Sequence, residues 1–237
     1  MTAAQDGAAD TPDRLPARRD VFVGRHSKVW QALSCRPEVA ALQPIAIGHA
    51  DIPGFGFTRG DRVWLLSYSR RARENRAMLE SIARAGAGEI VYVSSSATIV
   101  DGVTRCYEYP RVKREAEQAA LTLPEARVLT IGMVYEDPAE LPGGACAATS
   151  LCELAAFVAM PEWPEAAGRR KRLLRILRRP FRHAGERWAY SAYGRLMVWA
   201  GDFPCALRPL DMLLRALGVR WYGYTFLSNR LWSSTIS

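Results

Sequence analysis

Residues 91–117, VYVSSSATIVDGVTRCYEYPRVKREAE, combine a hydroxyl, a phenol and an ammonium at regular spacing. Tyr109 follows Ser96 by thirteen residues, and Lys113 follows Tyr109 by four. Positions four apart share one face of a helix, so the phenol and the ammonium are expected to meet. A nearby ammonium lowers the pKa of a phenol, which is ordinarily about 10, by about 1–3 units. With a serine beside it, the phenol becomes a proton relay for oxidising an alcohol or reducing a carbonyl, and a separate cofactor must carry the hydride.

Short apolar runs typical of buried strands alternate with stretches of helical spacing in the first part of the chain. Strands are expected at 20–24, 44–49, 62–69, 89–96 and 126–135, and helices at 27–33, 72–86 and 109–121. This alternation predicts right-handed crossovers and a parallel sheet covered on both faces. The connection between the second and third strands is too short for a helix and a further strand. The predicted fold is therefore α/β, a truncated Rossmann-like doubly wound parallel sheet with a helical, basic C-terminal region.

Three ordered stretches carry a family resemblance: SSSAT (94–98), the Y-x-x-x-K pair of Tyr109 and Lys113, and IGMVYEDP (131–138). In this order they resemble the short-chain dehydrogenase/reductase superfamily, specifically its extended NAD-dependent sugar epimerase/dehydratase branch. The resemblance implies that Ser96 orients the substrate hydroxyl and that Tyr109 is the acid/base. It implies that Lys113 lowers the tyrosine pKa and holds the nicotinamide ribose of NAD or NADP. Each residue taken alone is also explained as part of a solvated helix pair or a polar strand end.

The turn after the first strand, VFVGRHSKVW, departs from the phosphate-binding turn of that superfamily. Gly24 matches its first glycine, whereas Ser27 stands at the second and Trp30 at the third. Gly24, Arg25 and Ser27, together with Lys113, are the expected cofactor-binding residues. Ser27 can cap the following helix. Arg25 either adds positive charge for phosphate or is a solvated turn residue.

The segment GRRKRLLRILRRPFRH (168–183) separates leucines from arginines when it is placed on a helix. Such a helix can lie on an anionic membrane surface, or pack its apolar side on the domain and leave its arginines in water. The aromatic and basic stretch that follows also suits a substrate lobe or a homo-oligomer contact. No nucleic-acid-reading motif accompanies the charge, so no nucleic acid partner is expected.

Length and composition set the remaining expectations. The chain has 237 residues, 49% of them hydrophobic, and a net charge of +8. We expect a disordered tail over 1–19, a Rossmann-like dinucleotide-binding domain over 20–145 and a helical substrate or membrane-interface region over 146–237. No signal peptide and no apolar stretch of about 18 residues is found, which predicts a cytoplasmic protein, at most peripheral at the inner face of the membrane. The scattered histidines and cysteines lack metal-ligand spacing, so no metal site is predicted.

Together these features predict an NAD(P)-dependent epimerase or reductase. Its substrate would be a nucleotide- or lipid-linked sugar in polysaccharide or glycolipid biosynthesis. The alternative is a non-catalytic relative that acts as a scaffold or regulator of membrane-associated glycan assembly. The altered turn at 24–30 favours this alternative, and the intact set of Ser96, Tyr109 and Lys113 disfavours it.

Overall fold

The structure is a computed structural model that describes residues 18–105, 107–201 and 223–236, together with the isolated residues 205, 209, 212, 213 and 216. Most of the predicted amino-terminal tail, residues 1–17, lies outside the described residues. The first strand begins at Arg19, one residue earlier than predicted.

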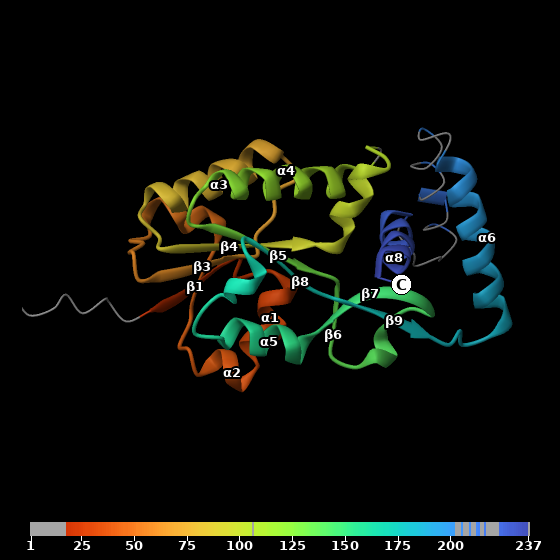
Figure 1. Ribbon diagram of the computed structural model, residues 1–237, viewed down its shortest axis with the longest axis horizontal. Helices are drawn as coiled ribbons and strands as arrows, with labels where there is room; N and C mark the ends of the chain where they lie inside the picture. Colours follow the sequence, from red (N-terminus) through yellow and green to blue (C-terminus); the bar gives the residue numbers. More distant parts are fainter. Residues whose placement is uncertain are drawn as a thin grey trace, which may run out of the picture.

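A six-stranded sheet, parallel throughout, forms the centre of the molecule (Figure 1). Its order is β2-β1-β3-β4-β5-β8. The strands are β1 (Arg19–Val23), β2 (Ile45–Ile47), β3 (Asp61–Leu65), β4 (Glu89–Ser95), β5 (Ala126–Ile131) and β8 (Arg170–Leu173). The central strands are apolar runs because both of their faces are covered. The predicted α/β doubly wound sheet is thus confirmed.

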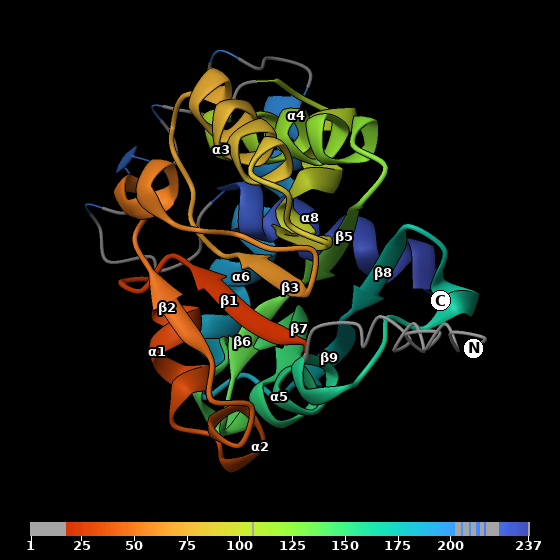
Figure 2. The ribbon, with the colours of Figure 1, turned by 90° about the vertical axis from the view of Figure 1, so that its left-hand side faces the viewer.

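Helices cover the two faces of this sheet, and each face has its own apolar core (Figure 2). One face carries α3 (Ala72–Arg84) and α4 (Glu108–Thr122); the other carries α1 (Lys28–Ser34), α2 (Pro37–Ala40) and α5 (Leu151–Ala159). Strand β1 shows the alternation, because Val21 and Val23 pack toward the first face and Phe22 toward the second. Short 3-10 helices connect the elements: η1 (His49–Gly54), η2 (Ser96–Gly102), η3 (Pro138–Glu140) and η4 (Glu165–Ala167).

The sheet is truncated beyond β1, as the short second connection predicted. Only β2 lies on that side, and η1 replaces the helix and further strand of a full Rossmann half. The chain passes from β1 outward to β2 and then returns to β3 on the opposite side of β1. This change of direction creates a topological switch point between β1 and β3, where ligands of open parallel sheets bind.

The region beyond residue 145 contains strands that the sequence analysis missed. Residues 168–183 form β8 and β9 (Arg175–Arg179), so the helix predicted there is wrong. Strand β9 joins a second sheet of order β6-β7-β9, with β6 (Met133–Tyr135) and β7 (Gly144–Ser150). The region over 146–237 that was predicted to be helical thus also contains strands, and the main sheet extends into it through β8. Helices α6 (Ala184–Gly201) and α8 (Gly223–Ile236) do form in this region.

Backbone pairing explains why strands form where an amphipathic helix was predicted. The outer edge of β5 and one edge of β7 need partners for their polar groups. Strand β8 supplies the first and β9 the second. The helix on which the predicted anionic membrane surface depended does not exist. Among the described helices, none is long and apolar enough to cross a membrane.

We predict that Gly132, between β5 and β6, tolerates no side chain. A Cβ atom there would lie 2.4 Å from the carbonyl oxygen of Ala147 on β7. Gly132→Ala should lower the free energy of unfolding by about 1–3 kcal/mol, since the backbone of β7 must shift. Gly102→Ala is the matched control, because its added Cβ meets nothing within 4 Å. Urea unfolding of both variants measures the difference, and equal stabilities would show that β7 does not pack against Gly132.

Candidate active site

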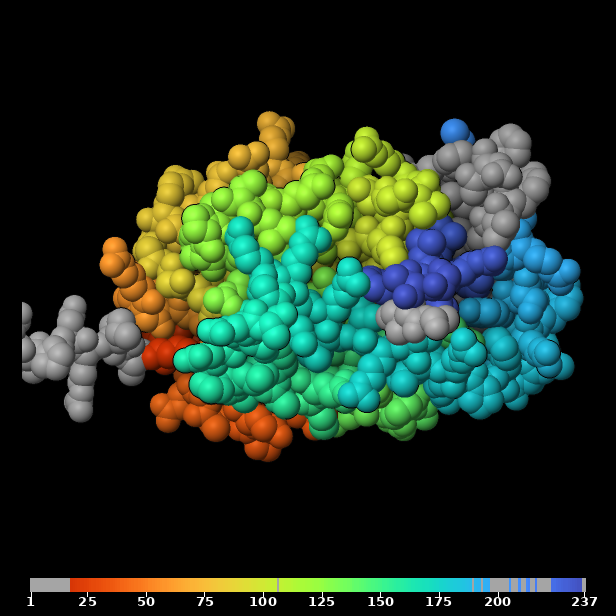
Figure 3. Space-filling view, in the orientation of Figure 1, coloured from red at the N-terminus to blue at the C-terminus, as the bar shows by residue number. Residues whose placement is uncertain are grey.

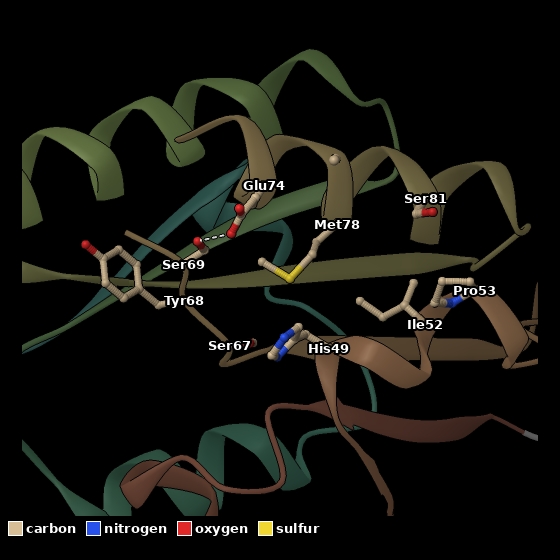
Figure 4. A pocket seen from close by; sticks show the side chains of 10 residues that line it. His49, Ile52, Pro53, Ser67, Tyr68, Ser69, Glu74, Met78 and Ser81 are labelled. Atoms are coloured by element: carbon tan, nitrogen blue, oxygen red, sulfur yellow. Dashed lines mark hydrogen bonds between the residues drawn. The ribbon is translucent and has the colours of Figure 1, made fainter. Parts of the chain in front are cut away.

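A cavity of about 500 Å³ opens at the switch point, between η1, the segment after β3 and helix α3 (Figure 4). Ile52, Pro53 and Met78 supply apolar walls, and Ser67 and Glu74 are among its polar groups. An apolar slot with a few polar groups suits a flat heterocycle with an attached hydroxylated group.

The turn after β1 has one of the properties expected for cofactor binding. Gly24 has a φ of +118°, and a Cβ there would lie 2.9 Å from the Ser67 nitrogen, so glycine is required. Ser27 accepts a hydrogen bond from the Trp30 nitrogen at 3.1 Å and caps α1, as predicted. Arg25 pairs with Asp51 at 3.3 Å, which partly neutralises its charge. The close approach of the Ser67 backbone, just after β3, thus explains why residue 24 is a glycine. Arg25 remains half-exposed beside the switch point.

The turn also lacks the room that a glycine at its third position would give. The Trp30 ring packs on Phe22 of β1 with 4.5 Å between ring centroids. The backbone N–H groups of Gly24 and Arg25 both donate to the Ile47 carbonyl, at 2.8 and 3.1 Å. These two N–H groups are therefore occupied within the fold.

Tyr109 lies at the carboxyl end of β4, where it lines a small cavity together with Ser95, whose side chain acts on the phenol. Ser96, which was predicted to orient a substrate hydroxyl, lines the same small cavity of about 180 Å³ as Ser95 and Tyr109. Its carbonyl accepts hydrogen bonds from Ser228 Oγ and Trp232 Nε1, both at 2.9 Å. The structure thus pairs Tyr109 with Ser95, one residue earlier in the chain.

Two tyrosine rings enclose Tyr109. Tyr68 meets it edge-on at 5.1 Å, and Tyr224 of α8 stacks on it at 5.4 Å between ring centroids. Burial raises the pKa of Tyr109, and the Ser95 side chain opposes this only in part. The predicted lowering of the Tyr109 pKa is therefore wrong in this structure, and the phenol is protonated at neutral pH.

Lys113 is buried under the same strand end. Its Nζ donates to the Val93 carbonyl at 3.0 Å and lies 4.9 Å from the Tyr92 ring and 5.4 Å from the Tyr68 ring. Burial lowers the pKa of Lys113 to about 8, and the Glu117 carboxylate opposes that shift. The ammonium is thus directed to a backbone carbonyl, with Tyr68 beside it.

Glu117 is a site residue whose role was missed. It is buried, and it accepts hydrogen bonds from Ser94 Oγ at 2.6 Å and Thr98 Oγ1 at 3.1 Å, and pairs with Arg114 at 2.9 Å. Its position three residues after Arg114 is a sequence signal that could have indicated the ion pair between them. No local signal indicates Tyr224, because it reaches the site from a distant helix.

Comparison with known proteins gave matches only among solved structures. No family model matches the sequence, and no characterised protein matches it. The chain is similar to UDP-N-acetylglucosamine 4-epimerase from Bacillus cereus at 11% identity and a TM-score of 0.48, covering 68% of this chain and 80% of the other. It is similar to a short-chain dehydrogenase/reductase superfamily protein from Agrobacterium tumefaciens with bound NAD at 14% identity and a TM-score of 0.48, covering 68% and 79%. It is also similar to a GDP-L-fucose synthetase from Naegleria fowleri at 11% identity and a TM-score of 0.49, covering 70% and 75%.

The lowered pKa of Lys113 generates a prediction about stability and pH. Between about pH 8 and pH 10.5, the unfolded chain keeps a proton that folded Lys113 has released. The stability of the native chain should therefore rise with pH in this window relative to Lys113→Met. Below pH 8, Lys113 is protonated in both the folded and the unfolded chain, and the folded chain bears the full cost of burying the charged group. Lys113→Met should therefore be more stable than the native chain by about 2 kcal/mol, a value that allows for the hydrogen bond lost with the ammonium.

Denaturant unfolding at a series of pH values measures this difference. Lys28→Met, which removes an exposed lysine, serves as the control and should show no such dependence. A stability difference between the native chain and Lys113→Met that stays constant from pH 7 to about pH 10.5 would contradict the lowered pKa.

Proposed function

We propose that the chain binds NAD or NADP and reduces a carbonyl group of an activated sugar. The observation that carries this proposal is the placement of Ser95 and Tyr109 in one cavity at the carboxyl end of β4, with Lys113 bound to the Val93 carbonyl of the same strand and separated from Tyr109 by the Tyr68 ring. A positioned phenol, a hydrogen-bonding serine and a nearby ammonium are the side chains that a proton relay requires.

The cavity at the switch point fits one end of a dinucleotide. The other end can reach Lys113 only if one side chain moves. The cavity of about 500 Å³ has apolar walls, including Ile52 and Met78, for a base and polar groups, including Ser67, for a ribose. Lys113 lies beyond Tyr68, and its Nζ is 5.4 Å from the centre of that ring. Rotation of Tyr68 would expose the ammonium to a second ribose.

The protonation states favour reduction. A bound nicotinamide supplies the hydride. Tyr109 is protonated at neutral pH, since the ordinary pKa of a phenol is about 10 and burial raises it further, so it can donate a proton to a carbonyl oxygen as negative charge develops there. The Ser95 side chain lies in the same small cavity and favours the phenolate that forms. Lys113 Nζ lies 5.4 Å from the centre of the Tyr68 ring, which also meets Tyr109, and its positive charge would stabilise that phenolate.

The substrate class rests on the motif resemblance. That resemblance is to the sugar epimerase/dehydratase branch, and two of the solved structures carry the names of an epimerase of a nucleotide sugar and a GDP-L-fucose synthetase. A nucleotide- or lipid-linked sugar in polysaccharide or glycolipid synthesis is accordingly the proposed substrate. Entry of a sugar ring requires Tyr224 to leave Tyr109, since the cavity there holds only about 180 Å³.

The same contacts also support the second candidate function, a non-catalytic scaffold or regulator of glycan assembly. Tyr68 and Tyr224 both cover Tyr109, and the turn at 24–30 lacks two glycines of the superfamily's phosphate-binding turn. A scaffold needs neither a cofactor nor an accessible phenol.

Cofactor binding separates the two functions. Titration of the purified chain with NADH and NADPH, followed by nicotinamide fluorescence, should give saturable binding of at least one of them. Tyr68→Ala should strengthen binding, because the ring that covers Lys113 is removed. Absence of binding by both the native chain and Tyr68→Ala at millimolar cofactor would favour the scaffold.

The site geometry also predicts which serine matters for turnover. In an assay with nucleotide-linked keto sugars and the cofactor that binds, Tyr109→Phe should reduce the rate by about 10²–10⁴. Ser95→Ala should cost more activity than Ser96→Ala, since the Ser95 side chain favours the phenolate of Tyr109. The reverse order would restore Ser96 to the role that the motif resemblance implies.

A further inference from the structure

A second concave region, walled by η2, α4, β8 and α8, is lined with basic side chains. Its volume is about 990 Å³, and none of its lining residues lines the cavity at Tyr109. In Figure 3 the yellow-green, green, teal and blue segments that form these walls come together on the visible face. The basic residues of its lining are Arg105, Arg114, Arg170, Lys171 and Arg172.

Positive charge exceeds negative charge in this region. On strand β8 Arg170 and Arg172 share one face, whereas Lys171 pairs with Leu129 and points to the other. Four basic side chains, Arg105, Arg114, Arg170 and Arg172, therefore face two acidic ones, Asp101 and Glu117, which leaves two positive charges. Glu117 already pairs with Arg114 at 2.9 Å. No ion pair joins Arg105, Arg170 or Arg172 to any carboxylate within the ranges that the structure describes, so these three cations repel one another with little compensation from the fold.

The fold holds part of this cluster in place. The Arg172 guanidinium lies 5.1 Å from the centre of the Trp232 ring. Trp232 is buried, and its Nε1 is bound to the Ser96 carbonyl. Strand β8 is paired along its length with β5, which sets Arg172 opposite Thr130, another lining residue. A guanidinium that is already positioned loses less conformational freedom when it binds a ligand.

We propose that this region binds a small phosphorylated molecule through a phosphate or pyrophosphate group. Arginine side chains hold phosphate oxygens with paired N–H groups, and a doubly charged group matches two uncompensated positive charges. The volume lies in the range of small-molecule sites, and a concave wall of four elements suits such a ligand better than a flat bilayer. The site is separate from that of the proposed reductase activity and does not depend on it.

Calorimetric titration of the full chain with pyrophosphate at low salt tests the proposal. The native chain should bind in the micromolar to low millimolar range, and added salt should weaken binding. Arg170→Gln and Arg172→Gln should each reduce affinity about tenfold, as expected for lost hydrogen bonds to a charged group. Arg170→Gln leaves the contact between Arg172 and Trp232 intact, so its loss of affinity cannot come from disruption of α8.

The matched control is the double variant Arg178→Gln/Arg182→Gln, compared with Arg170→Gln/Arg172→Gln. Arg178 and Arg182 are exposed and outside the lining, and the net charge changes equally. The control should change affinity less than twofold. Equal losses in the two doubles would overturn the proposal in favour of general charge attraction, and so would no heat of binding to the native chain. Binding of phosphatidylserine-containing vesicles through Arg170 and Arg172, without binding of pyrophosphate, would overturn it in favour of a membrane surface.

Discussion

The burial of one ammonium group sets the geometry of the candidate active site. Lys113 lies out of reach of water, so its charge depends on the Val93 carbonyl, two tyrosine rings and the carboxylate of Glu117. These contacts hold α4 in one register against β4, because a shift of α4 would leave a buried charge without partners. Tyr109, one helical turn earlier, is consequently carried to the end of β4 and meets Ser95.

Features of the fold and the site that depend on residues close together in the chain could be predicted from the sequence. Long apolar runs bounded by turn residues predicted the parallel sheet, and the spacing of Tyr109 and Lys113 on one helix predicted that they share a strand end. The choice between Ser95 and Ser96 was not accessible, because it depends on the residue at which β4 ends and η2 begins. Tyr224 was not accessible either, since its approach is set by the packing of a helix more than 100 residues away.

The error over residues 168–183 has a different origin. Helical periodicity measures how well one segment separates apolar from charged side chains, and it contains no information about unpaired strands elsewhere. Here β5 and β7 each have an edge whose backbone N–H and C=O groups need partners. Strand β8 pairs with β5, and β9 pairs with β7. The sheet is thus shortened beyond β1, where η1 replaces a strand, and extended beyond β5. The extension brings Arg170 and Arg172 beside residues of α4 and α8.

Helix α8 packs against η2, and its own residues line both the cavity at Tyr109 and the basic region. Tyr224, in its first turn, stacks on Tyr109, while Trp232, two turns later, lies under Arg172 and donates to the Ser96 carbonyl. One packed helix thus covers Tyr109 with its first turn and places an indole ring against Arg172 near its end.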